Sequence, residues 1–109
     1  MNTEEFFSRY DFSHSLLEEF AAPQEISTVF LTVHLYNKTD ETMTLEFAAA
    51  ELLQYPDFEC NFDLILSVKV VGNITKIHLY SDAYDVYYDL VIMSDDVAMV
   101  DMDGNFIVE

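Results

Sequence analysis

Most of the chain alternates apolar and polar residues with a period of two, the pattern of β-strands that bury one face. Two such runs follow each other, residues 26 to 36 and residues 42 to 47, and the polar segment NKTDE lies between them. Every second residue of these runs is apolar: Val29, Leu31, Val33, Leu35, Met43, Leu45 and Phe47. The pattern therefore predicts two strands joined by a turn at residues 37 to 41.

A third alternating run, residues 58 to 71, ends at Gly72-Asn73, a pair that suits a two-residue hairpin turn. That turn fixes the register of the next strand, residues 74 to 80. On the core side the predicted cross-strand pairs are Val68 with Ile77 and Leu66 with Leu79; on the other side they are Lys69 with Lys76, Ser67 with His78 and Ile65 with Tyr80. Because two lysines facing each other cost stability, we expect carboxylates of neighbouring strands to lie between them.

The stretch SDAYDVYYDLVIMSDD, residues 81 to 96, contains a further strand. One face of this strand carries Val86, Tyr88, Leu90 and Ile92. We expect the chain to turn at Asp95-Asp96 and residues 97 to 102 to pair back. Asp103-Gly104 predicts a last tight turn before a strand at residues 106 to 108.

The N-terminal segment has a helical pattern instead. Thr3 is a plausible N-cap, and acidic residues follow it in the first turn. Apolar residues at helical spacing allow either one helix over residues 3 to 21 or two short helices broken near Asp11, since residues 15 to 18 have the form of a capping box. Residues 48 to 55 stay open between a short helix and a continued, bulged strand.

These elements predict one α+β domain covering residues 1 to 109. Its expected architecture is one or two N-terminal helices packed on an antiparallel β-sheet of about five to seven strands. A chain of 109 residues that is 51% hydrophobic is large and apolar enough to bury a core without metal ions or disulfides.

Net charge is the sequence feature that narrows the possible functions most. The chain carries 21 acidic residues against four basic ones, for a formal net charge of −17. The acids are interleaved with apolar residues, so they must lie on folded faces and not in a solvated tail. So few cations argue against direct binding to nucleic acid or to an anionic membrane.

The sequence gives little support to catalysis or to metal binding. Cys60 is the single cysteine, and its acidic neighbours would raise a thiol pKa, which favours a buried structural role. The segment Asp101 to Gly104 resembles part of a calcium-binding loop, but the last ligand position would fall beyond residue 109. The three histidines fall on separate elements. We therefore expect a non-enzyme without cofactor or metal.

Localisation is expected to be cytoplasmic. The N-terminus is acidic and lacks the basic and apolar regions of a signal peptide. No apolar run approaches the length of about 18 residues that a membrane span requires.

The densest acidic region, residues 81 to 96, contains no lysine or arginine and holds several tyrosines. Tyrosines supply rigid contact area and carboxylates steer a cationic partner, so this composition favours a protein interface. The alternative is an acidic strand face that merely prevents aggregation. The predicted partner-binding residues are Asp82, Tyr84, Asp85, Tyr87, Asp89, Asp95 and Asp96.

In size and composition the chain looks like small acidic inhibitors of basic enzymes. We expect a non-catalytic inhibitor of a basic protein, foremost an immunity protein that neutralises a cognate bacterial nuclease-type toxin. The alternative is a nucleic-acid mimic of phage origin that blocks a restriction or CRISPR-type enzyme. An acidic structural or adaptor module is a third possibility.

Overall fold

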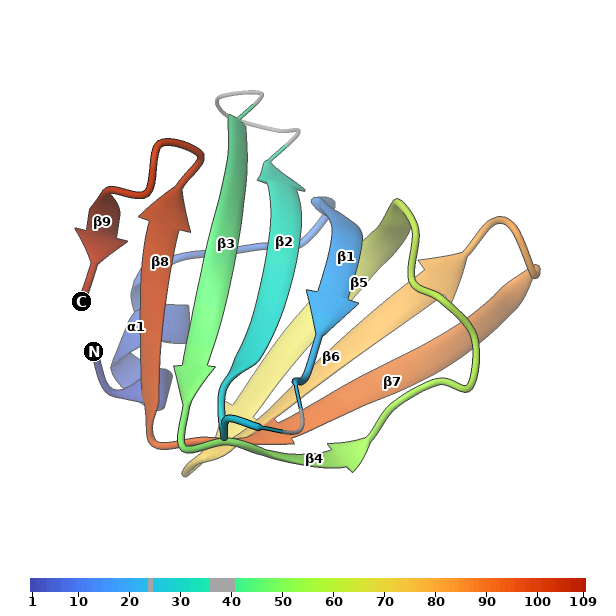
Figure 1. Ribbon diagram of the computed structural model, residues 1–109. Coiled ribbons are helices and arrows are strands. Elements are labelled where there is room, and N and C mark those ends of the chain that lie inside the picture. Colours follow the sequence, from blue (N-terminus) through green and yellow to red (C-terminus); the bar gives the residue numbers. More distant parts are fainter. Residues whose placement is uncertain (24, 36–40) are drawn as a thin grey trace.

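The computed structural model describes residues 1–23, 25–35 and 41–109. These residues form one short helix and a nine-stranded antiparallel sheet (Figure 1). In chain order the elements are α1 (Thr3–Arg9), β1 (Leu16–Ala21), β2 (Val29–Leu35), β3 (Glu41–Ala48), β4 (Glu51–Gln54), β5 (Asp63–Val71), β6 (Ile74–Ser81), β7 (Val86–Met93), β8 (Asp96–Asp101) and β9 (Phe106–Val108). The antiparallel sheet is confirmed, whereas the predicted number of strands, five to seven, is wrong.

The sheet closes on itself because two of its strands bend and remain paired beyond the bend. The strand order is β4-β7-β6-β5-β1-β2-β3-β8-β9, in which β4 continues β3 and β8 continues β7. On one side of the bends Ala48 pairs with Asp96. On the other side Glu51 pairs with Met93, so β3 with β4 runs along β7 with β8, whereas β9 pairs with β8 alone among the described strands.

The connection between β7 and β8 differs from the predicted turn. Residues 97 to 101 lie in β8, which pairs with β3 and β9 and not with β7. Ser94 holds the bend: its hydroxyl donates to the carbonyl of Ala48 at 2.6 Å, and its N–H donates to the carbonyl of Asn73 at 2.8 Å. The polar hydrogens of Ser94 thus find acceptors outside β7 and β8, and no tight hairpin between these two strands is needed to satisfy them.

Residues 48 to 55 follow the second of the two predicted alternatives, an interrupted strand. The interruption lies at Ala49, which has a φ of 46°, a left-handed conformation that non-glycine residues adopt rarely. The N–H of Ala50 donates to the carbonyl of Ser27 at 2.7 Å, and the chain then enters β4.

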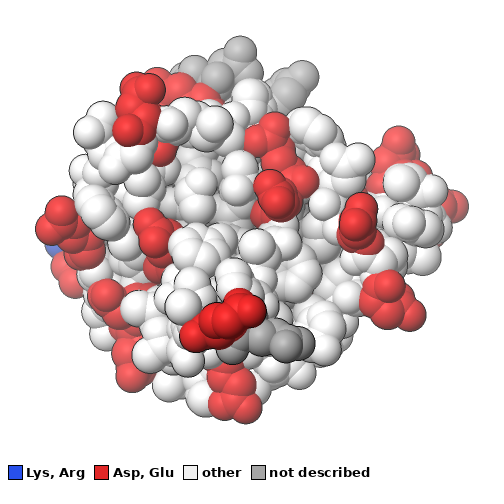
Figure 2. All heavy atoms as spheres, viewed as in Figure 1, with Lys and Arg blue, Asp and Glu red and all other residues white. Residues whose placement is uncertain are grey.

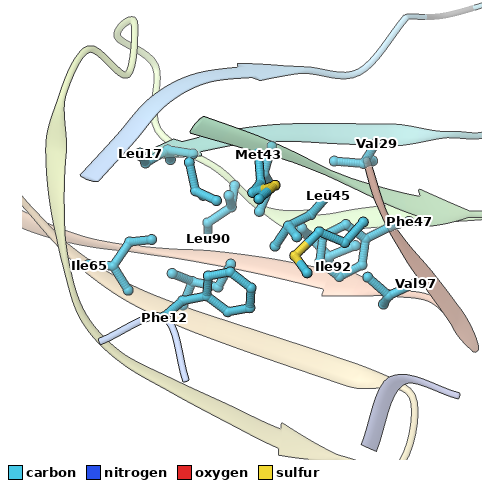
Figure 3. Close-up of a cluster of buried hydrophobic side chains, with 14 of the residues drawn as sticks. Phe12, Leu17, Val29, Met43, Leu45, Phe47, Ile65, Leu90, Ile92 and Val97 are labelled. Atoms are coloured by element: carbon cyan, nitrogen blue, oxygen red, sulfur yellow. The ribbon is translucent and has the colours of Figure 1, made fainter. Parts of the chain in front are cut away.

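The core fills the space inside the closed sheet. In Figure 1, β1, β2, β3 and β8 form the nearer layer, and β5, β6 and β7 cross behind them. Figure 3 shows side chains of both layers pointing into this common space. The fully buried side chains include Leu17, Leu31, Val33, Phe47, Leu79, Leu90, Ile92 and Val97.

The N-terminal segment forms one helix followed by a strand. Asn2, not Thr3, is the N-cap of α1, and its side-chain oxygen accepts the N–H of Glu5 at 3.2 Å. The helix contacts β5 and β8 and buries Phe6 completely. The second predicted helical segment is wrong, because residues 16 to 21 form β1, which pairs with β2 and β5 and buries Leu17. Tertiary pairing overrides the local helical pattern here.

The predicted β5–β6 hairpin is confirmed at its turn and corrected further along. Gly72 has a φ of 64°, as a primed turn requires, and Val68 pairs with Ile77. The predicted pairing of Leu66 with Leu79 is wrong: a β-bulge at Leu66 places Ile65 opposite Leu79. The bulge likewise places Leu64, not Ile65, opposite Tyr80.

The remaining local predictions have mixed outcomes. The tight turn at Asp103-Gly104 joins β8 to β9, and Gly104 has a φ of 85°. Of the predicted strand 26 to 36, residues 29 to 35 form β2, whereas Tyr36 and most of the predicted turn at 37 to 41 lie outside the described residues. The predicted strand 58 to 71 begins only at Asp63.

Candidate functional site

The seven predicted partner-binding residues occupy two separate places. Asp82, Tyr84 and Asp85 lie in the β6–β7 turn, and Tyr87 and Asp89 lie in β7. The other two, Asp95 and Asp96, lie at the bend beyond the opposite end of β7. Eight strand residues span about 24 Å, so the two groups do not form one compact site.

Asp95 and Asp96 help to fix the N-terminal segment. The N-terminal amine donates to Asp96 Oδ1 at 2.7 Å and to the carbonyl of Glu109 at 2.6 Å. The N–H of Thr3 donates to the carbonyl of Asp95 at 3.2 Å, and its hydroxyl donates to the carbonyl of Ser94 at 2.6 Å. Because the Asp96 carboxylate already pairs with the N-terminal amine, and because Asp95 and Asp96 both lie at the opposite end of β7 from the β6–β7 turn, we place both residues outside the candidate site.

The β6–β7 turn with Tyr87, residues 82 to 87, forms an exposed acidic and aromatic projection, here called the hairpin tip. Tyr84 is 56% exposed and Tyr87 is 67% exposed. Asp85 has a φ of 51°, and its carboxylate accepts the Tyr80 hydroxyl at 2.6 Å. That hydrogen bond is the main reason why the pKa of Tyr80 is raised to about 12. The hairpin tip is therefore a shaped surface and not a loose loop.

Asp89 is held by neighbours on β6. Its Oδ1 lies 2.7 Å from Nδ1 of His78, and its Oδ2 lies 3.6 Å from Nζ of Lys76. The ring of Tyr87 stacks on that of His78, with centroids 5.9 Å apart. The sequence pattern alone predicts no contact between His78 and Asp89. The hairpin register placed Ser67 opposite His78, and the register of β6 against β7 would have added Asp89.

Sequence reasoning missed a groove between β1 and the segment that precedes β5. It has a volume of about 490 Å³. Its lining residues, here called the acidic groove, are Glu18, Glu19, Phe20, Phe58, Glu59, Cys60 and Asn61. Three carboxylates and two phenylalanines thus line one groove, a combination that complements an extended cationic side chain.

A β-bulge explains how two consecutive glutamates can line the groove. In a regular strand successive side chains point to opposite faces, so one glutamate of the pair would point inward. The register of β1 against β2 shifts between Leu17 and Glu19, which makes Glu18 the additional residue. Leu17 therefore stays fully buried while Glu18 and Glu19 both remain accessible.

The acidic groove and the hairpin tip are contiguous through one aromatic ring. The ring centroid of Phe58, in the groove, lies 4.7 Å from the ring centroid of Tyr84 in the hairpin tip. It also meets Tyr88 edge-on, with centroids 5.1 Å apart. Glu18, Glu19 and Glu59 form no ion pair with any described residue, so this joint surface is not neutralised by the described part of the chain.

A buried polar cluster supports the floor of the groove. The Tyr88 hydroxyl donates to Asp63 Oδ2 at 2.6 Å and lies 3.3 Å from Sγ of Cys60. Asp63 is only 2% exposed. Burial, and then the hydrogen bond to Asp63, raise the pKa of Tyr88 well above its usual value. Burial also raises the pKa of the Cys60 thiol, as the structural role predicted for this cysteine requires.

Charge is distributed unevenly over the molecule. Figure 2 views the layer of β1, β2, β3 and β8. Among the described residues, acidic side chains stand all over this face, and a basic side chain shows only at the left rim. Lys69 and Lys76 lie on β5 and β6, in the layer behind. The described residues of the viewed face therefore present almost uncompensated negative charge.

Two further observations bear on function. No helix of the described ranges is long and apolar enough to cross a membrane. Comparisons with family models, with curated proteins and with solved structures found no match for this chain.

Proposed function

We propose that this protein is a non-catalytic inhibitor that binds a basic protein, and that the acidic groove and the hairpin tip form its partner-binding surface. The observation that carries the proposal is a groove lined by two phenylalanines and by three carboxylates that pair with no described residue, in contact with the exposed Tyr84 of the hairpin tip. We infer that the partner is a nuclease-type bacterial toxin and that the protein is its cytoplasmic immunity protein.

The chemistry of the groove favours lysine or arginine as the inserted group. A cation at about 4 Å from a carboxylate gains on the order of 4 kcal/mol at the effective dielectric constant of a protein surface, before desolvation is subtracted. Because several carboxylates share the groove, a cation can form an ion pair with one of them while the others accept hydrogen bonds from its remaining N–H groups. The faces of Phe20 and Phe58 offer additional cation–π contact.

The tyrosines of the hairpin tip add aromatic contact area to the electrostatic attraction of the carboxylates. Tyr84 packs on Phe58, and Tyr87 packs on Tyr80 with ring centroids 5.0 Å apart. Rings that are already packed lose little entropy on binding, which is why tyrosine serves well as an interface anchor. Asp82 and Asp85 then act at the rim, where they accelerate encounter with a positively charged partner.

The shape of the groove supports an immunity protein over a nucleic-acid mimic. A mimic has to present carboxylates at the spacing of phosphates along an extended surface, whereas the groove brings three carboxylates together with two phenylalanines in one small hollow. The mimic remains our second proposal because acidic side chains also cover the wide face seen in Figure 2. The two proposals differ in selectivity: an immunity protein binds one toxin, and a mimic binds many proteins that handle nucleic acid.

The experiment is an inhibition assay against a panel of purified nuclease domains of bacterial toxins, together with restriction and CRISPR-type nucleases. Lysozyme and cytochrome c serve as basic proteins that handle no nucleic acid. Stoichiometric inhibition of one toxin, with DNA cleavage by the other enzymes unaffected, supports the immunity protein. Inhibition of several enzymes that added DNA relieves supports the mimic. Binding to all basic proteins alike, lysozyme included, contradicts both.

A further inference from the structure

On the outer face of β5, β6 and β7 lies a second hollow, of about 260 Å³. Its lining residues, here called the basic pocket, are Ser67, Lys69, Lys76, His78 and Asp89. It contains two of the four basic residues of a protein with a net charge of −17. The basic pocket is separate from the acidic groove, and no part of the proposed partner binding requires it.

Cross-strand register assembles the pocket from three adjacent strands. Ser67 on β5 pairs with His78 on β6, which pairs with Asp89 on β7. Lys69 pairs with Lys76 in the next row on the same face, two residues along each strand. The bulge at Leu66 makes this possible, because Ile65 points inward and a regular alternation from Ile65 would direct Lys69 inward as well.

The two lysines are only partly neutralised. We expected carboxylates between them from neighbouring strands, but the structure provides Asp89 alone, and on the β7 side only. Both oxygens of Asp89 are engaged, one with His78 and one with Lys76. Lys69 forms no ion pair with a described residue. The pocket therefore retains net positive charge, and two facing lysines favour a bound anion between them.

Ser67 adds a neutral hydrogen-bond donor to the two lysines, and its hydroxyl donates to no described residue. Nδ1 of His78 lies 2.7 Å from Oδ1 of Asp89; when Nδ1 donates to this carboxylate, Nε2 of the neutral ring is an acceptor and adds no donor. Two ammonium groups and a hydroxyl thus line a small hollow, a donor set that suits the several oxygens of a tetrahedral dianion.

We propose that the basic pocket binds the phosphate group of a small phosphomonoester. Phosphate is preferred over a carboxylate because its three terminal oxygens can engage both lysines and Ser67 at once. Tyr87, which is 67% exposed and stacked beside His78, offers an adjacent ring for a flat group on the same ligand. A nucleoside monophosphate combines both features.

The net charge of the protein makes this binding weak but not impossible. Long-range repulsion between an anion and a protein of net charge −17 is screened beyond about 8 Å at physiological salt. The lysines of the pocket act within that distance. Salt should therefore weaken phosphate binding less than it weakens capture of a basic partner, because it also relieves the repulsion.

The test is titration of the full chain with inorganic phosphate, AMP and adenosine at constant ionic strength, followed by NMR of backbone amides. Both phosphate-containing probes should shift the amides of residues 67, 69, 76 and 78, and AMP should also shift Tyr87. Adenosine should not shift the amides of Lys69 and Lys76. Lys69→Gln and Lys76→Gln should each weaken phosphate binding about tenfold or more, the usual effect of removing a charge-assisted hydrogen bond.

Arg9→Gln is the matched control, because it removes the same charge from an exposed helix residue outside the pocket. It should leave phosphate affinity within about twofold. Equal weakening by Arg9→Gln and the lysine variants would overturn the site in favour of a general charge effect. Saturating phosphate without shifts at residues 67 to 78 would overturn it as well. Thermal melts check that each variant is folded.

Discussion

Tyr88 on β7 donates its hydroxyl hydrogen to the carboxylate of Asp63, at the start of β5, over a distance of 2.6 Å. The bond joins two strands separated by β6, close to the place where β1 meets β5 through only two residue pairs. It therefore anchors the start of β5 beside the short β1–β5 pairing, and through the contact of Tyr88 with Cys60 it adjoins the acidic groove.

Tyr88→Phe should destabilise the fold, because it leaves the buried carboxylate of Asp63 without the donor that the structure provides. The expected loss in unfolding free energy is about 1–3 kcal/mol, measured by urea denaturation. Tyr87→Phe is the control, since that ring is exposed and its change should fall within about 0.5 kcal/mol. Equal effects of both changes would show that the Asp63 bond contributes nothing specific.

Stability should decline as the pH rises from about 10 to 12. The folded-state pKa values of Tyr80 and Tyr88 are both raised, Tyr80 to about 12. A raised folded-state pKa means that the unfolded chain loses its protons first, so the stabilisation is complete below pH 10 and is lost above it. Melting temperatures across this range, compared between the wild type and Tyr88→Phe, measure the effect; the variant should decline less steeply.

Asp85→Asn provides an independent check on Tyr80. The hydrogen bond to Asp85 is the largest cause of the raised pKa, so its weakening should bring the ionisation of Tyr80 back towards its ordinary value of about 10. The ultraviolet absorbance of tyrosinate follows this titration. An unchanged titration curve would mean that the Tyr80–Asp85 bond does not persist in solution.

Core substitutions should reveal the bulge in β5. Ile65 is 1% exposed, whereas Leu66, which an uninterrupted alternation assigns to the core, is only half-buried. Ile65→Ala should therefore cost about 2–5 kcal/mol of unfolding free energy, and Leu66→Ala clearly less. Chemical denaturation measures both losses. A larger loss for Leu66→Ala than for Ile65→Ala would support a register without the bulge.

Thr75→Val should be neutral or stabilising although Thr75 is completely buried. Its hydroxyl has no hydrogen-bond partner among the described residues, so folding removes it from water without compensation. Valine has nearly the same shape and lacks the hydroxyl. A gain of up to about 1–2 kcal/mol is expected, and a loss greater than about 1 kcal/mol would indicate a partner in solution.

Local rules were sufficient for the parts of the fold that obey them. The alternation of β2 and β3 and the turn at Gly72 depend on neighbouring residues, and these predictions hold over the described residues. The helix predicted over residues 16 to 21 is wrong because a bulge at Glu18 interrupts the alternation of β1. The interruption leaves apolar residues at a spacing that resembles that of a helix. The bends at Ala49 and Ser94 depend on contacts far away in the sequence, which no local pattern contains.

The candidate site was predictable in composition but not in place. The exposed tyrosines and aspartates of the hairpin tip follow from the sequence of residues 81 to 96. The acidic groove does not, because it arises where the bulged end of β1 meets residues 58 to 61, some 40 residues later. The ion pair between the N-terminal amine and Asp96 likewise joins residues that lie 95 positions apart in the sequence.

The most direct test of the central claim compares the binding kinetics of a basic partner with two triple variants of equal charge. One combines Glu18→Gln, Glu19→Gln and Glu59→Gln in the acidic groove. The other combines Glu4→Gln, Glu41→Gln and Asp103→Asn, exposed acids outside it. Both remove three negative charges, so long-range steering should slow by a similar factor in the two proteins.

The dissociation rate separates them. Loss of groove carboxylates that pair with a buried cation should cost about 2–5 kcal/mol of binding, mainly as faster dissociation, whereas the control variant should dissociate like the wild type. Stopped-flow kinetics of each purified complex, at low and at high salt, provide the measurement. Dissociation that is faster only in the groove variant is the result we predict; equal dissociation rates in all three proteins would contradict the proposed binding site.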